Sequence, residues 1–219
     1  MNIQNLLLFL MELIGTIAFA ASGVMVGIRK NMDLFGVCVL GTVTAVGGGT
    51  IRDIVLCQIP SALLEPIYVE TSVITALLIF GFLYFKADKN AARFHNSYDR
   101  VMQLMDAIGL GIFTAVGVMT GIKQGYTDNT FLLAFLGTVT GVGGGLLRDM
   151  MAGNPPYIFV KHIYACASIV GAVVCVYMNR FVGNVEAMMV ACFVVILIRY
   201  LAAHYRWNLP RLSHNESEK

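Results

Sequence analysis

Long hydrophobic blocks constrain this 219-residue chain more than any other feature. Seven of them, separated by charged or Pro-containing breaks, are each about 20 residues long, which is enough to cross a hydrocarbon core of about 30 Å as an α-helix. Hydrophobic residues make up 58% of the chain and charged residues 13%, against about 45–50% and about 25% in soluble domains. The sequence therefore predicts an all-α integral membrane protein.

The hydrophobic blocks also predict a topology. The expected transmembrane helices cover residues 5–28, 34–57, 67–85, 101–122, 130–152, 158–178 and 182–204. Lys and Arg gather on one side, in the connectors 29–33 and 86–100, around Lys161 and in the tail after residue 204. The connectors of the opposite side hold only Lys123 and Arg180. Because basic residues favour the cytoplasmic side, the N-terminus is expected outside and the C-terminus in the cytoplasm.

A segment of the second hydrophobic block recurs in the fifth. Gly41–Asp53 (GTVTAVGGGTIRD) returns 96 positions later as Gly137–Asp149 (GTVTGVGGGLLRD), with ten of thirteen residues identical. Each copy belongs to a unit of three spans, so the second unit must enter the membrane upside down, and inverted repeats place a pathway or binding site at their interface. The expected organisation is a first three-helix repeat over 1–90, an inverted three-helix repeat over 91–180, a seventh helix over 181–205 and a cytoplasmic tail over 206–219.

Each copy carries a glycine triplet near the middle of its span, namely Gly47, Gly48 and Gly49 in the first copy and Gly143, Gly144 and Gly145 in the second. A glycine costs about 1 kcal/mol of helix propensity relative to alanine, so the triplets need a physical reason. One interpretation is close helix packing, because Gly41, Ala45 and Gly49 share one helix face and their counterparts do the same. The other is a kink or a short unwound stretch whose carbonyl groups face a cavity.

A second, polar stripe runs beside the small-residue face of each helix. It consists of Thr44, Gly48 and Arg52 in the first copy and of Thr140, Gly144 and Arg148 in the second. Residues four positions apart lie on the same helix face. We therefore expect one face to pack and the neighbouring face to contact water, with threonine hydroxyls and backbone oxygens offered to cations.

Ionisable side chains lie at membrane depth in both repeats. They are Glu12, Arg52, Asp53, Asp106, Arg148 and Asp149. A charge at the bilayer centre costs at least about 2.5–3.5 kcal/mol, so such groups normally pair or line water. Because adjacent helical residues do not face each other, each Arg is expected to meet a carboxylate of another helix, with Glu12 and Asp106 as the candidates. The formal balance of −2 favours cations, and a purely structural ion network is the alternative.

The remaining charged and cysteine residues give no comparable signal. Arg199, in the seventh span, is expected to extend to the cytoplasmic interface. A net charge of +2 without a long basic cluster gives no electrostatic footprint for nucleic acid. No Ser/His/Asp or Cys/His spacing indicates an enzyme, and neither a metal site nor a bound cofactor is expected. The cysteines are interpreted as small buried hydrophobic residues at positions Cys38, Cys57, Cys166, Cys175 and Cys192.

The paired segments Gly47–Asp53 and Gly143–Asp149 resemble the prokaryotic trimeric intracellular cation (TRIC) channel family, and the likeness covers residues 5–205. The resemblance implies a homotrimer among membrane lipids, in which each protomer has its own pore between the second and fifth helices, bent at their glycines. It also implies permeant monovalent cations, chiefly K+, with Na+ as the other candidate. Animal members carry a Lys-Glu-Val segment for phosphoinositide binding where this chain has Gly143–Gly145, which favours a bacterial inner membrane.

Three functions share this pattern of inverted repeats and glycine-rich helices. A channel needs a water path with weak ion sites, whereas a secondary transporter needs a closed pocket with convergent groups. The same bacterial group has been labelled a glycine transporter domain, so transport of glycine or another small amino acid is the alternative. A non-conducting scaffold is the third. The polar stripes offer no pocket chemistry for a zwitterion, and the sequence therefore favours the channel.

Overall fold

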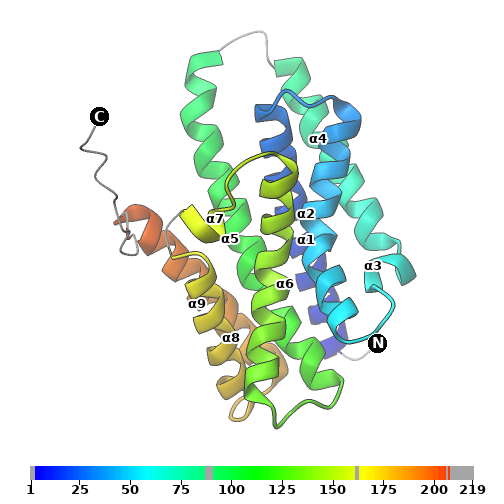
Figure 1. The fold of residues 1–219 in the computed structure, drawn as a ribbon, viewed down its shortest axis with the longest axis vertical. Coiled ribbons are helices and arrows are strands. Elements are labelled where there is room, and N and C mark those ends of the chain that lie inside the picture. The colour runs from blue at the N-terminus through cyan, green and yellow to red at the C-terminus, as the bar shows by residue number, and fades with distance from the viewer. Residues whose placement is uncertain (1–2, 87–90, 161–162, 206, 208–219) are drawn as a thin grey trace, which may run out of the picture.

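The computed structural model describes residues 3–86, 91–160, 163–205 and 207, and all regular secondary structure in this part of the chain is helical (Figure 1). The helices are α1 (Ile3–Arg29), α2 (Leu34–Val55), α3 (Ser61–Leu64), α4 (Ile67–Lys86), α5 (Ala91–Lys123), α6 (Thr130–Met151), α7 (Tyr157–Val160), α8 (Ala165–Asn179) and α9 (Asn184–His204). The helices long and apolar enough to cross a membrane are α1, α2, α4, α5, α6 and α9. The predicted all-α membrane fold is confirmed. Lys161 and, except for Trp207, the tail expected over 206–219 lie outside the described residues.

The sixth predicted span differs from the structure. Instead of one helix over 158–178, the chain forms the one-turn helix α7 and the 15-residue helix α8, which is only about 22 Å long. The first repeat has the same arrangement, because the one-turn helix α3 precedes α4. There Pro66 separates the two helices, whereas the corresponding residue of the second repeat is His162. Histidine does not interrupt a helical pattern as proline does, so hydropathy alone merges α7 with α8.

The central helices of the two repeats, α2 and α6, begin in the same way. The Asp33 carboxylate accepts a hydrogen bond from the Gly36 N–H at 2.7 Å, and the Asn129 side chain accepts one from the Leu132 N–H at 3.0 Å. These two N-caps are related by the same shift as the glycine triplets. In Figure 1, α2 runs downward and α6 runs upward, so the two helices are antiparallel. The predicted inverted repeat is therefore present in the structure.

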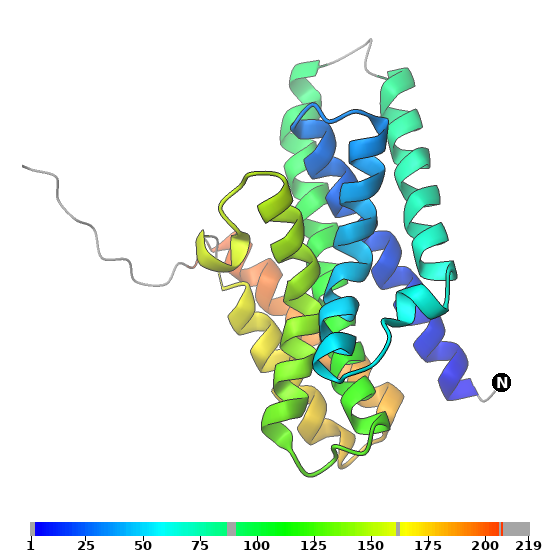
Figure 2. The ribbon, with the colours of Figure 1, turned by 45° about the vertical axis from the view of Figure 1, so that its right-hand side comes forward.

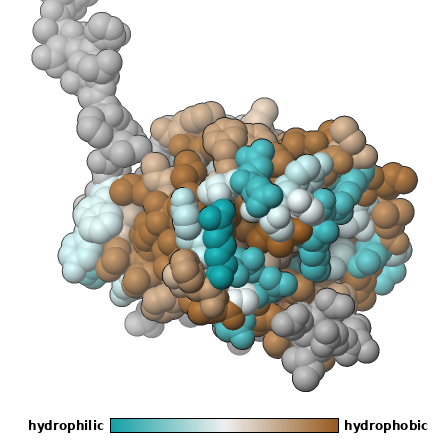
Figure 3. Space-filling model, turned by 90° about the horizontal axis from the view of Figure 1, so that it is seen from below, coloured by the Kyte–Doolittle hydropathy of each residue, from teal (hydrophilic) through white to brown (hydrophobic). Residues whose placement is uncertain are grey.

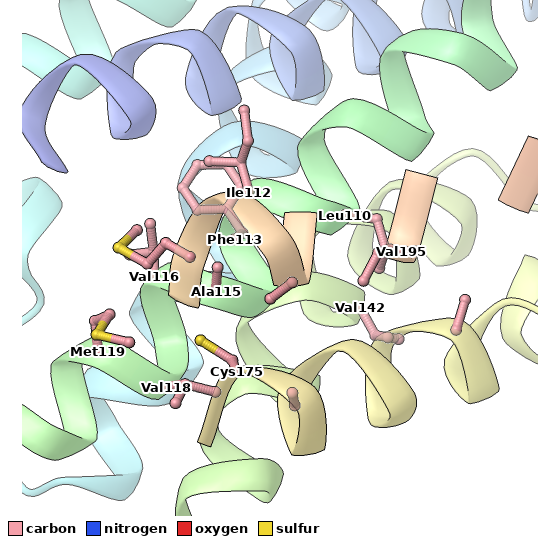
Figure 4. Packing of buried hydrophobic residues seen from close by; sticks show 14 of the residues in the cluster. Leu110, Ile112, Phe113, Ala115, Val116, Val118, Met119, Val142, Cys175 and Val195 are labelled. Atoms are coloured by element: carbon pink, nitrogen blue, oxygen red, sulfur yellow. The ribbon is translucent and has the colours of Figure 1, made fainter. Parts of the chain in front are cut away.

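The two repeats meet along α2 and α6, which pack against each other, while α1 packs on α2 and α5 packs on α6 (Figure 2). Helix α9 packs mainly on α5 and α8 of the second repeat and makes a smaller contact with α1. Leu110 and Phe113 of α5, Cys175 of α8 and Val195 of α9 belong to one buried cluster there (Figure 4). Helix α4 is the counterpart of α8 in the first repeat. Its hydrophobic side chains are exposed at Ile74, Leu77, Leu78, Phe82 and Phe85. Helix α9, which lies outside the two repeats, thus makes their surroundings unequal.

The end of the bundle seen from below is more polar at its middle than along its border (Figure 3). Figure 3 looks onto one end, where hydrophilic residues gather in the middle and hydrophobic residues lie around them. A bundle whose sides contact lipid and whose ends contact water shows this distribution. The polar positions at the ends of α2 and α6 therefore lie toward opposite aqueous sides, because the two helices are antiparallel.

Candidate functional site

The two central helices cross at Gly48 and Gly144. A Cβ atom added at Gly48 would lie 2.1 Å from the carbonyl oxygen of Thr140, and one added at Gly144 would lie 2.1 Å from the carbonyl oxygen of Thr44. Both oxygens belong to the backbone of the opposite helix, which cannot rotate away as a side chain can. The crossing therefore has no room for any side chain, and close packing explains the middle glycine of each triplet.

Both triplets lie inside unbroken helix. Residues 47–49 and 143–145 have α-helical hydrogen bonding throughout, within α2 and α6. The predicted unwound stretch is therefore wrong, because packing at the crossing stabilises the helices despite the low helix propensity of glycine. A bend at the triplets stays a prediction.

The small-residue face of each central helix was predicted to pack, and it contacts neighbouring helices along most of its length. A Cβ atom at Gly41 would lie 3.0 Å from Val24 of α1, and one at Gly137 would lie 2.6 Å from Val118 of α5. Gly49 differs from them, because the nearest atom to its ideal Cβ is Nη2 of Arg52, at 3.8 Å. At the start of the motif, each central helix thus lies close to α1 or α5 of its own repeat. At the middle of the motif, it lies close to the central helix of the opposite repeat.

The polar stripe is packed, so the prediction of a wet helix face is wrong. Thr44 and Thr140 are 0% and 1% exposed, and their hydroxyls donate at 2.6 Å to the carbonyl oxygens four residues earlier. Each hydroxyl also lies against a glycine of the neighbouring helix, Gly23 for Thr44 and Gly117 for Thr140. A threonine hydroxyl that bonds its own helix can pack against an apolar neighbour. The structure thus gives both hydroxyls a packing role.

Replacing Thr140 by valine tests this assignment. We expect the free energy of unfolding to fall by about 1 kcal/mol, the usual net value of one hydrogen bond, and any K+ flux to stay unchanged. Thermal unfolding and flux in liposomes would be measured on the same preparation, with Thr44→Val as the repeat-related variant. A large drop in flux at unchanged stability would restore the sequence-based prediction that these hydroxyls contact permeant ions.

An Arg–Asp pair follows each triplet and is built identically in both repeats. Nε of Arg52 donates to Oδ1 of Asp53 at 2.7 Å, and Nε of Arg148 donates to Oδ1 of Asp149 at 2.9 Å. The second carboxylate oxygen accepts the backbone N–H eight residues later, which begins the one-turn helix α3 or α7. The expectation that adjacent residues do not meet is wrong here, because the long guanidinium folds back along the last helical turn.

In the second repeat this pair joins a buried network. Nη1 of Arg148 donates to Oδ1 of Asp106 on α5 at 2.6 Å and also to the hydroxyl of Ser22 on α1. The Tyr164 hydroxyl donates to the same Asp106 oxygen at 3.4 Å. The side chains of Arg148 and Asp106 are both 0% exposed. The expected contact between Arg148 and Asp106 is present, and through Ser22 it links the two repeats. We call Asp106, Arg148, Asp149 and Tyr164 the second cluster.

The first repeat arranges the same residue types differently. The Tyr68 hydroxyl donates to Glu12, which is half-buried, and Nη2 of Arg52 donates to the Ser61 hydroxyl at 3.4 Å. Among the described residues, Arg52 has no ion pair with Glu12, so that expectation is wrong. The second repeat has Val116 at the position equivalent to Ser22 of the first, so Arg52 has no corresponding hydroxyl across the repeat interface. We call Glu12, Arg52, Asp53 and Tyr68 the first cluster.

Arg199 is the residue of this region that sequence reasoning places wrongly. It does not extend to the interface but is 6% exposed, and its guanidinium carbon lies 4.7 Å from the centroid of the Tyr164 ring. The signal that could have found it is its position inside a hydrophobic block, because an ionisable residue there is a functional candidate by default. Tyr68 and Tyr164 were also findable, since they share the register of the repeat.

Comparisons with known proteins agree with this architecture. The family model described as "Glycine transporter" matches residues 9–84 and 103–180. The UPF0126 inner membrane protein YadS of Escherichia coli strain K12 is 33% identical, over 97% of this chain and 99% of that relative. A prokaryotic TRIC channel crystallised in 0.5 M KCl has a TM-score of 0.82 at 30% identity, over 94% of this chain and 100% of that one. The trimeric intracellular cation channel orthologue from Rhodobacter sphaeroides has a TM-score of 0.79 at 31% identity, over 91% and 98%.

Proposed function

This chain belongs to the prokaryotic TRIC channel family, and on that premise we propose that it is a cation channel with a pathway inside each protomer, along the interface of α2 and α6. K+ is the proposed main permeant ion, with Na+ as the second. The observation that carries the proposal is the placement of two repeat-related Arg–Asp clusters beyond the Gly48–Gly144 crossing, toward opposite ends of the bundle. Charged groups at membrane depth are retained where ions pass.

The conformation described here corresponds to a closed pathway. Backbone atoms of α2 and α6 are in contact at Gly48 and Gly144, which leaves no passage between the helices at that level. Opening requires these helices to separate or slide, and the Arg148 network opposes that motion because it joins α1, α5 and α6. We therefore propose that release of Arg148 from Ser22 and Asp106 accompanies opening.

The assembly and location follow from the relatives. A homotrimer is proposed because the structural neighbours are named trimeric channels, with the exposed hydrophobic side chains of α4 in contact with lipid or with a second protomer. The inner membrane name of the Escherichia coli relative supports a bacterial inner membrane. The proposed orientation has the N-terminus outside, from the distribution of Lys and Arg.

Purified protein in planar lipid bilayers tests the function. Under a K+ gradient, the expected result is unitary currents that reverse near the K+ equilibrium potential. Saturable, ion-coupled glycine uptake into liposomes without unitary currents would replace the channel by a transporter. Correctly assembled protein with neither activity would indicate a scaffold.

Glu12→Gln tests the contribution of the first cluster to cation flow. The cluster has two carboxylates and one guanidinium, a formal charge of −1, and the substitution makes it neutral. We expect K+ conductance to fall at low ionic strength and the difference from the unchanged protein to shrink at high salt, where charges are screened. Glu186→Gln is the control, because Glu186 is exposed in the first turn of α9. Equal effects of the two variants would remove Glu12 from the pathway.

A further inference from the structure

The two clusters carry the same formal charge when only the repeats are counted. Each contains two carboxylates and one guanidinium, with Glu12, Arg52 and Asp53 in the first and Asp106, Arg148 and Asp149 in the second, which gives −1 for each. A pathway built from the repeats alone would thus be electrostatically equivalent at its two ends. Any difference in charge between the two ends must come from residues outside the repeats.

Arg199 supplies such a difference in charge. It belongs to α9, which packs on α5 and α8 and has no counterpart in the first repeat. Its guanidinium lies over the ring of Tyr164, whose hydroxyl is 3.4 Å from Oδ1 of Asp106. The positive charge is therefore stacked on a member of the second cluster, and with it the formal charge of that cluster becomes zero.

The burial of Arg199 indicates that its charge interacts with this cluster. Neither Nε nor Nη1 of Arg199 has a hydrogen-bond partner among the described residues, and the side chain is nine-tenths buried. A buried guanidinium without a direct partner is stable only where the surroundings are negative. Asp106 and Asp149 supply that negative charge, and Oδ2 of Asp106 likewise has no partner among the described residues.

We propose that Arg199 is a charge-setting residue of the ion pathway, which neutralises the second cluster and leaves the first cluster as the cation-attracting end. This inference rests on the proposed channel function. Because α2 and α6 are antiparallel, the two clusters lie toward opposite ends of the bundle. A pathway with a charge of −1 toward one end and 0 toward the other conducts cations more easily in one direction.

Single-channel recordings test the proposal through the ratio of the larger to the smaller current at equal positive and negative voltages, which does not depend on the orientation of insertion. We expect a ratio of at least about two in the unchanged protein and close to one in Arg199→Gln, since the lost charge makes the ends equal. Arg199→Lys should keep the original ratio. Arg180→Gln is the matched control, because Arg180 also stacks on a tyrosine, Tyr177 at 5.5 Å, but is exposed.

The outcomes separate the inference from the proposed function. Currents with the same ratio in the unchanged protein and in Arg199→Gln would overturn the inference and leave the channel standing. If no variant conducts, the channel proposal fails, and thermal unfolding of Arg199→Gln, Asp106→Asn and the double variant still tests the charge interaction. A smaller effect of Arg199→Gln in the Asp106→Asn background supports it, and strictly additive effects overturn it.

Discussion

Replacing Gly48 by alanine is expected to lower the free energy of unfolding by about 1–3 kcal/mol, although alanine favours a helix by about 1 kcal/mol. The new methyl group would lie 2.1 Å from the Thr140 carbonyl oxygen and 3.2 Å from the Gly144 nitrogen. Both are backbone atoms, so α2 and α6 must move apart and lose contacts along their interface. Thermal unfolding in detergent measures the effect, and Gly144→Ala should reproduce it.

Gly81→Ala is the matched control for this experiment. Gly81 lies in α4, and beyond its chain neighbours and the adjacent helix backbone no atom of the described residues lies within 4 Å of its ideal Cβ position, so alanine should leave stability equal or raise it by up to about 1 kcal/mol. Equal unfolding temperatures for the two variants would contradict the crossing at Gly48. The larger substitutions Gly48→Leu and Gly144→Leu are expected to reduce K+ flux in protein that still assembles. Unchanged flux would show that both glycines act in helix packing and not in the ion pathway.

The sequence predicts the elements of this fold wherever a signal lies along the chain itself. The five spanning helices of the two repeats, and α9, follow from hydropathy, and the inverted order follows from the recurrence of Gly41–Asp53 as Gly137–Asp149. The division of the sixth span into α7 and α8 is missed because His162 stands where the first repeat has Pro66. Comparison of the two copies, rather than hydropathy, is the signal that would have revealed it.

The candidate site is less predictable, because its contacts depend on which neighbours surround each charge. The repeat identifies Arg52 and Arg148 as equivalent, yet only Arg148 reaches a carboxylate on another helix. The surroundings of the two guanidinium groups differ at Ser22 against Val116 and at Glu12 against Asp106. The water-facing assignment of Thr44 failed for a related reason. A hydroxyl that donates to a carbonyl oxygen of its own helix can be buried without a water partner. The sequence does not show whether a threonine donates to its own helix or to water.

Arg148→Met is expected to cause the largest loss of stability, about 3–5 kcal/mol. Methionine keeps much of the side-chain volume, so the loss reports the charge. Asp106 and Asp149 would stay buried without the guanidinium that they share, and Asp106 is 0% exposed. Ser22 would lose the hydrogen bond from Arg148 that links the two repeats. Thermal and chemical unfolding of the reconstituted or detergent-bound protein measure the change.

Arg52→Met is the control for that substitution, because Arg52 has the equivalent place in the repeated motif while its ion pair involves Asp53 alone. Its expected loss is smaller, since one carboxylate rather than two is left without a partner and Glu12 keeps its bond from Tyr68. Asp106→Asn in the Arg148→Met background should recover part of the stability, because it removes one of the two uncompensated charges. Equal losses for the two Arg variants would show that Arg148 does not join the repeats. If the network also holds α2 and α6 together, folded Arg148→Met channels should open more often.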